Sequence, residues 1–406
     1  MRCGLLGKKL GHSYSPQIHR HLGDYTYELF EKTPEELGNF LLNGDFSGLN
    51  VTIPYKKDVI PYCDELTPRA ALLGAVNTIV RNKDGKLIGH NTDYFGFQSM
   101  LERTGLVVTG KKVLVLGSGG ASATASCVLR EVGANVIIIS RSGENNYENI
   151  ANHKDTAVIV NATPVGMFPS TGTSPVDLSM FPALEGVLDI VYNPARTQLL
   201  LDAEKRGLIT ENGLWMLVAQ AKESAEWFTG IKINNNAIET IHAILRRQME
   251  NTILIGMPGC GKSTIGKRLA MHLNKQFYDT DTEIIKRAGI SIPEIFDHYG
   301  ETGFRNIETE VLRDLGKRSG LVIATGGGCV TRTENYDLLH QNGTIIWIQR
   351  ELYALPTDGR PLSRWDKMEA MYEVRKPLYA SFCDYIIENN SDMDEVLSNL
   401  IVIGGI

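Results

Sequence analysis

Long hydrophobic runs are absent from this chain. Nowhere do ~18 apolar residues follow one another, which is the length that an α-helix needs to cross a bilayer. The first residues, MRCGLLG, lead into a strand-like pattern without the charged and apolar regions of an export signal. We therefore expect no membrane span, no export and a cytoplasmic location.

Cysteine and positive charge are both scarce. The chain has 6 cysteines among 406 residues, and they form no close pairs of the kind that bind zinc or make a redox disulfide. A reduced compartment fits this spacing. The formal net charge is −6, whereas nucleic acids and anionic membranes attract proteins with an excess of positive surface. We therefore expect neither nucleic acid nor membrane as a partner.

The length of the chain and its pattern of apolar runs indicate three domains. At about 150 residues per domain, 406 residues suggest about three compact units. In the first hundred residues, short apolar runs alternate with turn signals, and Asp84-Gly85 predicts a hairpin. From Lys111 onward, buried strands alternate with helices, which is typical of a doubly wound nucleotide-binding fold. The same alternation restarts after the polar segment RRQMEN, so we place a junction near Met249.

The fold class is therefore α/β throughout. We predict a mixed α/β domain at residues 1–98, completed by a return helix at about 229–247. A Rossmann-like domain follows at residues 99–228. Residues 249–406 then form a further α/β domain with a parallel sheet of its own.

The strongest local signal is the segment GMPGCGKST at residues 256–264, which lies between a strand and a helix. Its residue pattern and its position between a strand and a helix match those of the phosphate-binding P-loop. Glycines let backbone N–H groups surround phosphate oxygens, the Lys reaches the outer phosphates, and the hydroxyl binds Mg²⁺. We predict that ATP is held by Gly259, Cys260, Gly261, Lys262, Ser263 and Thr264. Because Cys260 lies inside this loop, we expect thiol alkylation to block phosphorylation.

A second glycine-rich loop, Gly117-Ser118-Gly119-Gly120-Ala121, also joins a strand to a helix. In an NAD site, an acidic residue about 20 residues further on, at the end of the next strand, binds the free ribose 2′-hydroxyl. Here that strand ends in Ser140-Arg141-Ser142, a guanidinium flanked by two hydroxyls. This set suits a 2′-phosphate and offers no carboxylate, which favours NADP(H) over NAD.

Several motifs in the first two predicted domains stand in the order and spacing typical of one enzyme family. They are GHSYSP (11–16), NVTIPYK (50–56), GAVNT (74–78), NTD (91–93), NATPVGM (161–167), YNP (192–194) and Gln220. With the glycine-rich loop among them, this part of the chain resembles shikimate dehydrogenase. The resemblance implies NADPH-dependent reduction of 3-dehydroshikimate to shikimate.

The resemblance also implies which residues bind and which catalyse. Lys56 and Asp93 would be the catalytic pair, because a positioned ammonium with a partner carboxylate can move a proton to or from the C3 oxygen. Ala123 and the run at 143–146 replace basic residues that are common in the family, which predicts a weaker preference for NADP. The shikimate pocket would be lined by Ser13, Ser15, Asn50, Thr52, Asn77, Asp93, Tyr192 and Gln220.

The C-terminal part resembles shikimate kinase. Behind the P-loop come DTD (279–281), FRNIE (304–308), GGG (326–328), RPL (360–362) and RKPLY (375–379), in the order of that family. The resemblance implies that shikimate is phosphorylated at its 3-hydroxyl. It also implies that shikimate is held by Asp281, Arg305, Gly327 and Arg375, with the two guanidiniums on the carboxylate.

The same resemblance assigns the groups that act on the phosphoryl group. Asp281 would orient or deprotonate the attacking hydroxyl, while Lys262 and the lid residue Arg360 offset charge on the transferring group. Ser263 would bind Mg²⁺, and Asp279 would join the metal through water. The lid before Arg360 is shorter than usual and lacks an Arg expected against adenine, which bears on ATP affinity.

Two other functions remain open beside this fusion of two enzymes of aromatic biosynthesis. One half could be a non-catalytic module that binds shikimate compounds, although Lys56, Asp93, Lys262 and Asp281 are all present. Alternatively, the pair could be a quinate or aminoshikimate dehydrogenase with a related kinase. A pocket with the same ring contacts can accept an altered substituent.

Overall fold

The computed structural model describes residues 1–11, 13–355 and 365–403. The chain divides into two compact units. Unit 1 contains Met1–Val165, Ser174–Tyr192 and Asp202–Ile244, and unit 2 contains Gly166–Thr173, Asn193–Leu201 and Leu245–Ile406. The domain boundaries predicted at residues 98 and 249 stay predictions.

The first sheet of unit 1 is mixed, with the strand order β2-β1-β3-β5-β6-β4. The strands β5 and β6 form the predicted antiparallel hairpin, and Gly85 in its turn has a φ of 81°. The strand β1 pairs in parallel with both β2 and β3. The six strands are β1 (Arg2–Gly7), β2 (Thr26–Glu31), β3 (Gly48–Val51), β4 (Glu65–Leu66), β5 (Thr78–Arg81) and β6 (Leu87–His90).

The helices of this part include α1 (Ser15–His19), α2 (Pro34–Asn43), α3 (Pro68–Leu73) and the 3-10 turn η1 (Ile60–Tyr62). A capping box starts α2, because the Thr33 and Glu36 side chains each bond the other's backbone N–H. Leu37 and Leu41 of this helix join a buried core against the sheet. Leu49 and Val51 of β3 and Ile79 of β5 belong to the same core.

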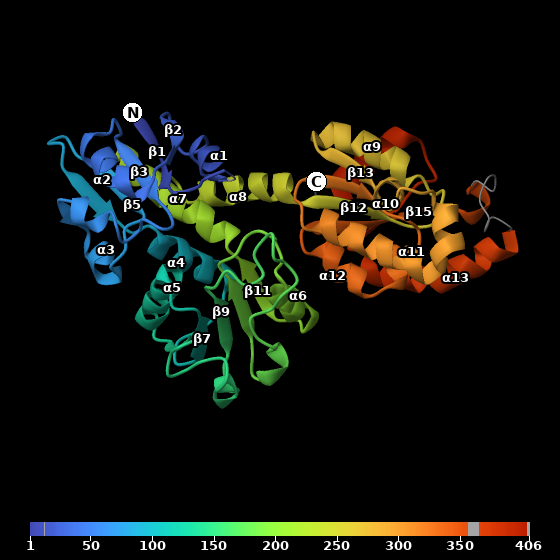
Figure 1. The fold of residues 1–406 in the computed structure, drawn as a ribbon, viewed down its shortest axis with the longest axis horizontal. Coiled ribbons are helices and arrows are strands. Elements are labelled where there is room, and N and C mark those ends of the chain that lie inside the picture. The colour runs from blue at the N-terminus through green and yellow to red at the C-terminus, as the bar shows by residue number, and fades with distance from the viewer. Residues whose placement is uncertain (12, 356–364, 404–406) are drawn as a thin grey trace. The chain divides into compact units, whose positions relative to one another are not determined.

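The second sheet of unit 1 is parallel, with the order β11-β10-β9-β7-β8 (Figure 1). The inner strands β9 and β10 are wholly buried and apolar except for their last residues, Asn161 and Asp189, as expected of a sheet covered on both faces. The strands are β7 (Lys112–Leu116), β8 (Asn135–Ile139), β9 (Val158–Asn161), β10 (Gly186–Asp189) and β11 (Ile209–Asn212). With them lie α5 (Gly120–Glu131), η2 (Ile150–His153) and η3 (Leu178–Met180), while α6 (Gln198–Lys205) contains residues of both units.

Two helices of unit 1, α4 (Asp93–Thr104) and α7 (Leu214–Thr229), pack closely against each other. Gly96 permits this approach, because a Cβ there would lie 2.8 Å from the Met216 carbonyl oxygen. The contact brings Asp93, the first residue of α4, toward the middle of α7. A further helix, α8 (Asn236–Met249), ends near the predicted junction.

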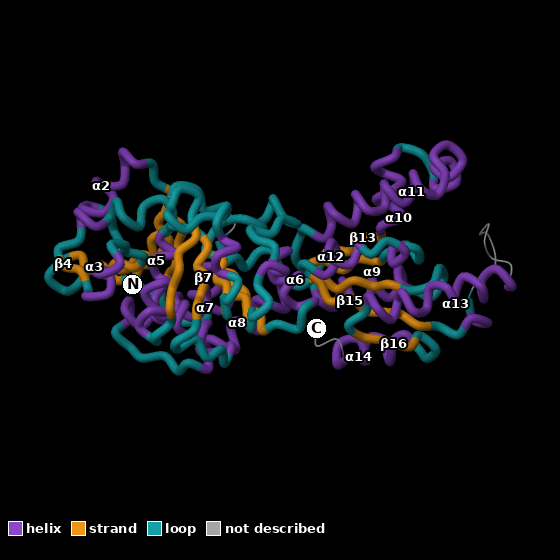
Figure 2. The backbone as a smooth tube through the Cα atoms, turned by 90° about the horizontal axis from the view of Figure 1, so that it is seen from below, coloured by secondary structure: helices purple, strands orange, loops and turns teal. Residues whose placement is uncertain are grey.

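Unit 2 has a five-stranded parallel sheet with the order β13-β14-β12-β15-β16. Helix α9 lies on one side of it and α11 and α12 on the other (Figure 1), and the strands run side by side (Figure 2). The strands are β12 (Asn251–Ile255), β13 (Gln276–Asp279), β14 (Leu321–Ala324), β15 (Gly343–Gln349) and β16 (Tyr385–Glu388). The helices are α9 (Lys262–Leu273), α10 (Thr280–Ala288), α11 (Ile292–Gly316), α12 (Glu334–His340), α13 (Trp365–Phe382) and α14 (Met393–Ile403), with short turns η4 (Cys329–Thr331) and η5 (Leu352–Ala354).

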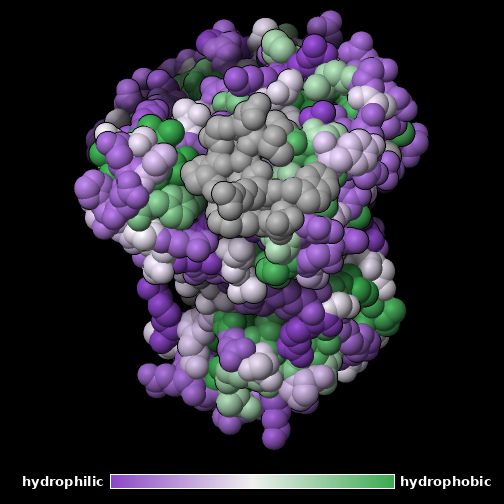
Figure 3. Space-filling model, turned by 90° about the vertical axis from the view of Figure 1, so that its right-hand side faces the viewer, coloured by the Kyte–Doolittle hydropathy of each residue, from purple (hydrophilic) through white to green (hydrophobic). Residues whose placement is uncertain are grey.

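The surface shows mostly hydrophilic side chains, with smaller hydrophobic areas between them, on the face drawn in Figure 3. Among the described residues, no helix combines the length and apolar character needed to cross a membrane. Helices accompany each of the three sheets, so the predicted α/β fold class is confirmed.

Candidate active sites

A cavity of about 230 Å³ lies in unit 1, where β3 and β10 end and β5 begins, near α4 and α7. Ile190, Met216 and Leu217 form part of its apolar wall and were not predicted. The two on α7 lie four and three positions before Gln220, so helical spacing could have indicated them. Every residue predicted for this site lines the cavity: Ser13, Ser15, Asn50, Thr52, Lys56, Asn77, Asp93, Tyr192 and Gln220.

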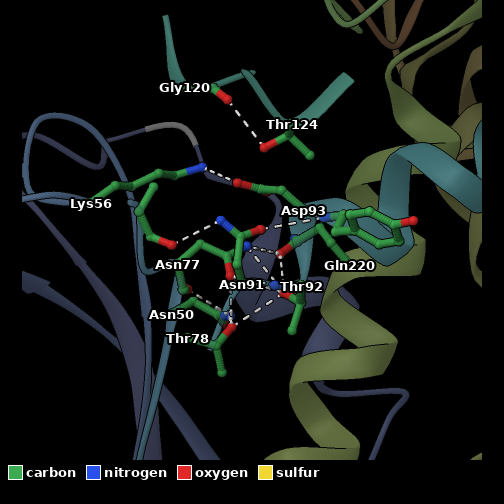
Figure 4. A network of polar contacts seen from close by, with 12 residues as sticks. Asn50, Lys56, Asn77, Thr78, Asn91, Thr92, Asp93, Gly120, Thr124 and Gln220 are labelled. Atoms are coloured by element: carbon green, nitrogen blue, oxygen red, sulfur yellow. Dashed lines mark hydrogen bonds and ion pairs between the residues drawn. The ribbon is translucent and has the colours of Figure 1, made fainter. Parts of the chain in front are cut away.

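The one ion pair among those residues joins Lys56 and Asp93. Lys56 Nζ lies 2.5 Å from Asp93 Oδ2, and their side chains are 29% and 14% exposed (Figure 4). Asp93 begins α4, where the helix dipole favours a carboxylate. The pair is thus partly shielded from water, which strengthens its mutual attraction, yet its ammonium is open to the cavity.

Amide side chains form the rest of the polar wall. Asn77 Oδ1 accepts a hydrogen bond of 2.7 Å from the Thr92 backbone, and Asn77 Nδ2 donates to Gln220 Oε1 at 3.4 Å. Figure 4 shows Asn50, Asn77 and Gln220 converging from β3, the start of β5 and α7. Because these partners fix which end of each amide is donor and which is acceptor, the wall presents a defined pattern to a polyhydroxylated ligand.

The glycine-rich loop at residues 117–121 leads from β7 into α5. Gly117 has a φ of 109°, and a Cβ there would lie 3.0 Å from the Ala162 carbonyl oxygen. Gly119, the N-cap of α5, provides no side-chain cap, and nothing lies within 4 Å of a Cβ built at Gly119 or Gly120. With Ser118 and Ala121 beside them, the first N–H groups of α5 therefore suit an anion such as a pyrophosphate.

The predicted 2′-phosphate residues follow β8. Arg141 and Ser142 are exposed, and the Ser140 N–H donates to the Asn145 carbonyl at 3.1 Å. Asn146 Nδ2 donates to the carbonyl oxygen of Gly143, so the loop after Arg141 is closed on itself. The residues at 143–146, which stand where we expected basic residues, therefore fix the backbone of this loop. Arg141 is the cation that the loop presents.

Unit 2 contains a larger cavity of about 560 Å³ around the P-loop. Lys262 is buried, and its Nζ donates to the carbonyl oxygens of Gly256 and Met257 at 2.8 and 2.9 Å. Ser263 Oγ donates to Asp279 Oδ2 at 2.6 Å. Gly259, Gly261, Lys262, Ser263, Thr264, Asp279 and Asp281 all line this cavity.

Cys260 departs from the prediction. Its side chain is 0% exposed and belongs to the hydrophobic core of unit 2 rather than to the cavity wall. Only its backbone remains in the loop, where its carbonyl accepts a 2.7 Å bond from Asn389. This burial opposes reaction of the thiol with an alkylating reagent, and the expected block of phosphorylation stays a prediction.

The same cavity carries the residues predicted to hold shikimate. Arg305, Gly327 and Arg375 line the cavity, and Arg375 Nη1 donates to the Gly327 carbonyl at 3.1 Å. Arg305 Nη1 donates to Glu308 Oε2 at 2.7 Å, and burial raises the pKa of Glu308, with the Arg305 charge opposing it. Glu308 had no predicted role, although its spacing of three from Arg305 on a helix indicates an ion pair. The predicted lid residue Arg360 lies outside the described residues.

The oxygen donors beside the P-loop fit a hard divalent cation. A serine hydroxyl and a carboxylate are ligands that Mg²⁺ accepts, either directly or through water. Ser263 and Asp279 supply them within 2.6 Å of each other. The uncapped start of α9 and the buried Lys262 ammonium fit the phosphates that accompany such an ion.

These geometries define two classes of enzyme in one chain. Unit 1 joins a parallel sheet, an uncapped glycine-rich loop and a Lys–Asp pair in a polar cavity, as in a dehydrogenase that uses a dinucleotide. Unit 2 joins a P-loop to a cavity with two guanidiniums, as in a kinase for a small anionic substrate.

Comparison with known proteins names the families. The model of the shikimate dehydrogenase substrate binding domain matches residues 5–79, and the shikimate kinase model matches residues 258–403. A shikimate dehydrogenase (NADP(+)) of Clostridium perfringens is 36% identical over 265 residues, covering 60% of this chain and 97% of that protein. The chain belongs to the shikimate dehydrogenase family, and a shikimate kinase domain follows in the same polypeptide. The predicted fusion of an oxidoreductase and a phosphotransferase is confirmed.

Solved structures resemble the dehydrogenase part. Shikimate 5-dehydrogenase from Thermus thermophilus, in complex with NADP(H) and shikimate, has 30% identity and a TM-score of 0.55, covering 60% of this chain and 98% of its own. Quinate dehydrogenase from Corynebacterium glutamicum, in complex with NAD, has 27% identity and a TM-score of 0.56 with the same coverage of both chains.

Proposed function

We propose that the chain catalyses two successive reactions: reduction of 3-dehydroshikimate to shikimate, and phosphorylation of shikimate at its 3-hydroxyl. The observation that carries this proposal is the grouping of side chains. In unit 1, nine residues named from separate motifs line one cavity. In unit 2, the P-loop, Asp281, Arg305 and Arg375 line another.

In the first reaction, Lys56 transfers the proton. NADPH, when bound, supplies the hydride for C3 of the ring, so the C3 oxygen must gain a proton. The Lys56 ammonium faces the cavity and donates that proton, while Asp93 at 2.5 Å holds Nζ in place. In the reverse direction, neutral Lys56 accepts the hydroxyl proton. The remaining ring hydroxyls meet Asn50, Asn77 and Gln220, and the carboxylate meets Ser13 and Ser15.

NADPH would be held at the carboxyl ends of two neighbouring parallel strands, β7 and β8. The pyrophosphate accepts hydrogen bonds from the N–H groups at the uncapped start of α5. Arg141 with Ser140 and Ser142 binds the 2′-phosphate at the end of β8. Since the loop that follows Arg141 adds no second cation, we expect a moderate preference for NADPH.

In the second reaction, Asp281 would accept the proton of the attacking 3-hydroxyl as that oxygen bonds to the γ-phosphorus, while the bond from this phosphorus to the ADP oxygen breaks and ADP leaves. ATP supplies the γ-phosphoryl group, and Mg²⁺ held by Ser263 and Asp279 would neutralise part of its charge. Lys262 leaves its two carbonyl partners and donates to the phosphate oxygens. Arg305 and Arg375 bind the carboxylate, so that the hydroxyl points toward the P-loop.

A second candidate substrate calls for a direct test, because a quinate dehydrogenase is similar over the same region. The purified chain is given 3-dehydroshikimate with NADPH, and separately shikimate or quinate with NADP⁺. Products are identified by mass. We expect kcat/KM for shikimate oxidation to be at least tenfold above that for quinate. This ratio corresponds to a difference of about 1.4 kcal/mol between the two substrates in the free energy of the transition state. Faster oxidation of quinate would overturn the substrate assignment.

The kinase part is tested with shikimate, ATP and Mg²⁺. We expect a phosphomonoester of shikimate in equal amount to ADP, and no ADP formation above background without shikimate. Hydrolysis of ATP without transfer to shikimate would contradict the proposal for unit 2.

A further inference from the structure

The Asn50 carboxamide is held from behind by two side chains that do not line the cavity. Tyr27 Oη donates to Asn50 Oδ1 at 2.8 Å, and Asn50 Nδ2 donates to Ser224 Oγ at 2.7 Å. Neither Tyr27 nor Ser224 belongs to the described cavity wall, whereas Asn50 does. Asn50 Nδ2 also donates to Thr78 Oγ1 at the longer distance of 3.2 Å. Both ends of this amide are therefore hydrogen-bonded to groups outside the described cavity wall.

The donor and acceptor roles of the Ser224 hydroxyl are fixed by its neighbours. Its side chain is fully buried, and its single hydroxyl proton goes to the Gln220 carbonyl oxygen at 2.8 Å. The oxygen then has two lone pairs left, which accept from Asn50 Nδ2 and from one of two threonine hydroxyls. Those hydroxyls belong to Thr78 and Thr92, at 3.0 and 3.1 Å. Figure 4 shows both threonines beside Asn50 and Gln220.

Tyr27 is equally constrained. Its ring stacks on His19, with centroids 3.9 Å apart and an angle of 9° between planes. Burial raises the pKa of Tyr27 well above its ordinary value, so the phenol keeps its proton and acts as a donor. A flipped Asn50 would place its NH₂ against this donor and its oxygen against Ser224, whose proton is already used.

We propose that Ser224 and Tyr27 are positioning residues for the dehydrogenase substrate, because together they hold the Asn50 carboxamide in one orientation toward the ring hydroxyls. This inference rests on the proposed function of unit 1 and adds two residues to it. Ser224 lies 174 positions from Asn50 in sequence. The helix that carries Gln220 thus also sets the direction of an amide on β3.

The test uses the full chain and the variants Ser224→Ala and Tyr27→Phe, assayed for shikimate oxidation with NADP⁺. Losing one hydrogen bond to the amide should raise KM for shikimate about tenfold in each variant, with kcat changed less than KM. KM for NADP⁺ should stay unchanged. Kinase activity of the same preparation reports the concentration of folded chain, and circular dichroism reports folding.

Ser126→Ala is the matched control. Ser126 is also a buried helical serine of unit 1, but its hydroxyl has no hydrogen-bond partner among the described residues. We expect its KM for shikimate to equal that of wild type. A similar rise in KM in this control would show that loss of any buried serine disturbs the site, and would overturn the inference.

Coupling through Asn50 separates positioning from a general structural effect. In the double variant Ser224→Ala with Tyr27→Phe, kcat/KM for shikimate should fall by less than the product of the two single fold-losses, because both residues act on one amide. In an Asn50→Ala background, neither substitution should change kcat/KM further. Full additivity, or an undiminished effect without Asn50, would overturn the inference while wild-type shikimate oxidation still supports the proposed function. If wild type does not oxidise shikimate, the proposed function fails and the inference fails with it.

Discussion

The two cavities of this chain would bind the same ring acid, yet they present different chemistry to it. The polar wall of the cavity in unit 1 consists of hydroxyl and amide groups around one ion pair, Lys56 with Asp93. That of unit 2 gathers Lys262, Arg305 and Arg375 together with carboxylates. Proton transfer at a neutral oxygen needs one positioned acid, whereas phosphoryl transfer develops charge that several cations must offset. The reaction, rather than the substrate, explains the difference.

The largest effect is expected at the P-loop. Lys262→Met removes the buried ammonium that would meet the phosphates, and we expect kcat for phosphorylation to fall by about 10³-fold. Shikimate oxidation by the same chain should not change. Steady-state rates of both reactions provide the measurement. A kinase loss below tenfold would mean that Lys262 holds the loop carbonyls and does little in transfer.

A loss of similar kind is expected in unit 1. Lys56→Met removes the proton donor, so dehydrogenase kcat should fall by about 10²- to 10⁴-fold, while kinase activity stays intact. Rates of NADPH consumption with 3-dehydroshikimate measure this. Near-normal reduction by the variant would contradict the role of Lys56 as acid.

The cofactor site offers a smaller, directional change. Arg141→Asp exchanges a phosphate-binding cation for a hydroxyl acceptor. The ratio of kcat/KM for NADPH to that for NADH should fall by about 10- to 100-fold, as the loss of a charge-assisted hydrogen bond predicts. Arg130→Asp, on α5, serves as a control for charge alone. An unchanged ratio in the Arg141 variant would show that this exposed residue does not contact the cofactor.

The smallest effect concerns Cys260. Because its thiol is buried in the core, brief iodoacetamide treatment near pH 8 should leave kinase activity within about twofold of the untreated enzyme. Burial also raises the pKa of the half-buried Cys63 to about 11, so its thiolate is scarce at that pH. Mass spectrometry of tryptic peptides identifies the modified cysteines. Rapid inactivation that ATP prevents and that Cys260→Ala abolishes would restore the original expectation.

The sequence predicted the fold and most of the site because these depend on local patterns. Strand and helix periodicity placed β7 to β10 and α9. The P-loop and the glycine-rich loop at 117–121 each follow a strand, where parallel sheets collect their functional groups. The direction of the Cys260 side chain could not be predicted, since it depends on the turn of a glycine loop. The link from Ser224 to Asn50 was equally hidden, because it joins residues 174 positions apart through packing of α7 on the first sheet.

The central claim is that two independent sites act in succession on one freely released intermediate. The most direct test mixes the Lys56→Met and Lys262→Met chains with 3-dehydroshikimate, NADPH, ATP and Mg²⁺. Neither variant alone should form shikimate 3-phosphate beyond the residual rate of its damaged site. The mixture should form it readily, because shikimate made by one chain diffuses to the intact kinase of the other. Product from either variant alone at the wild-type rate, or none from the mixture, would contradict the account.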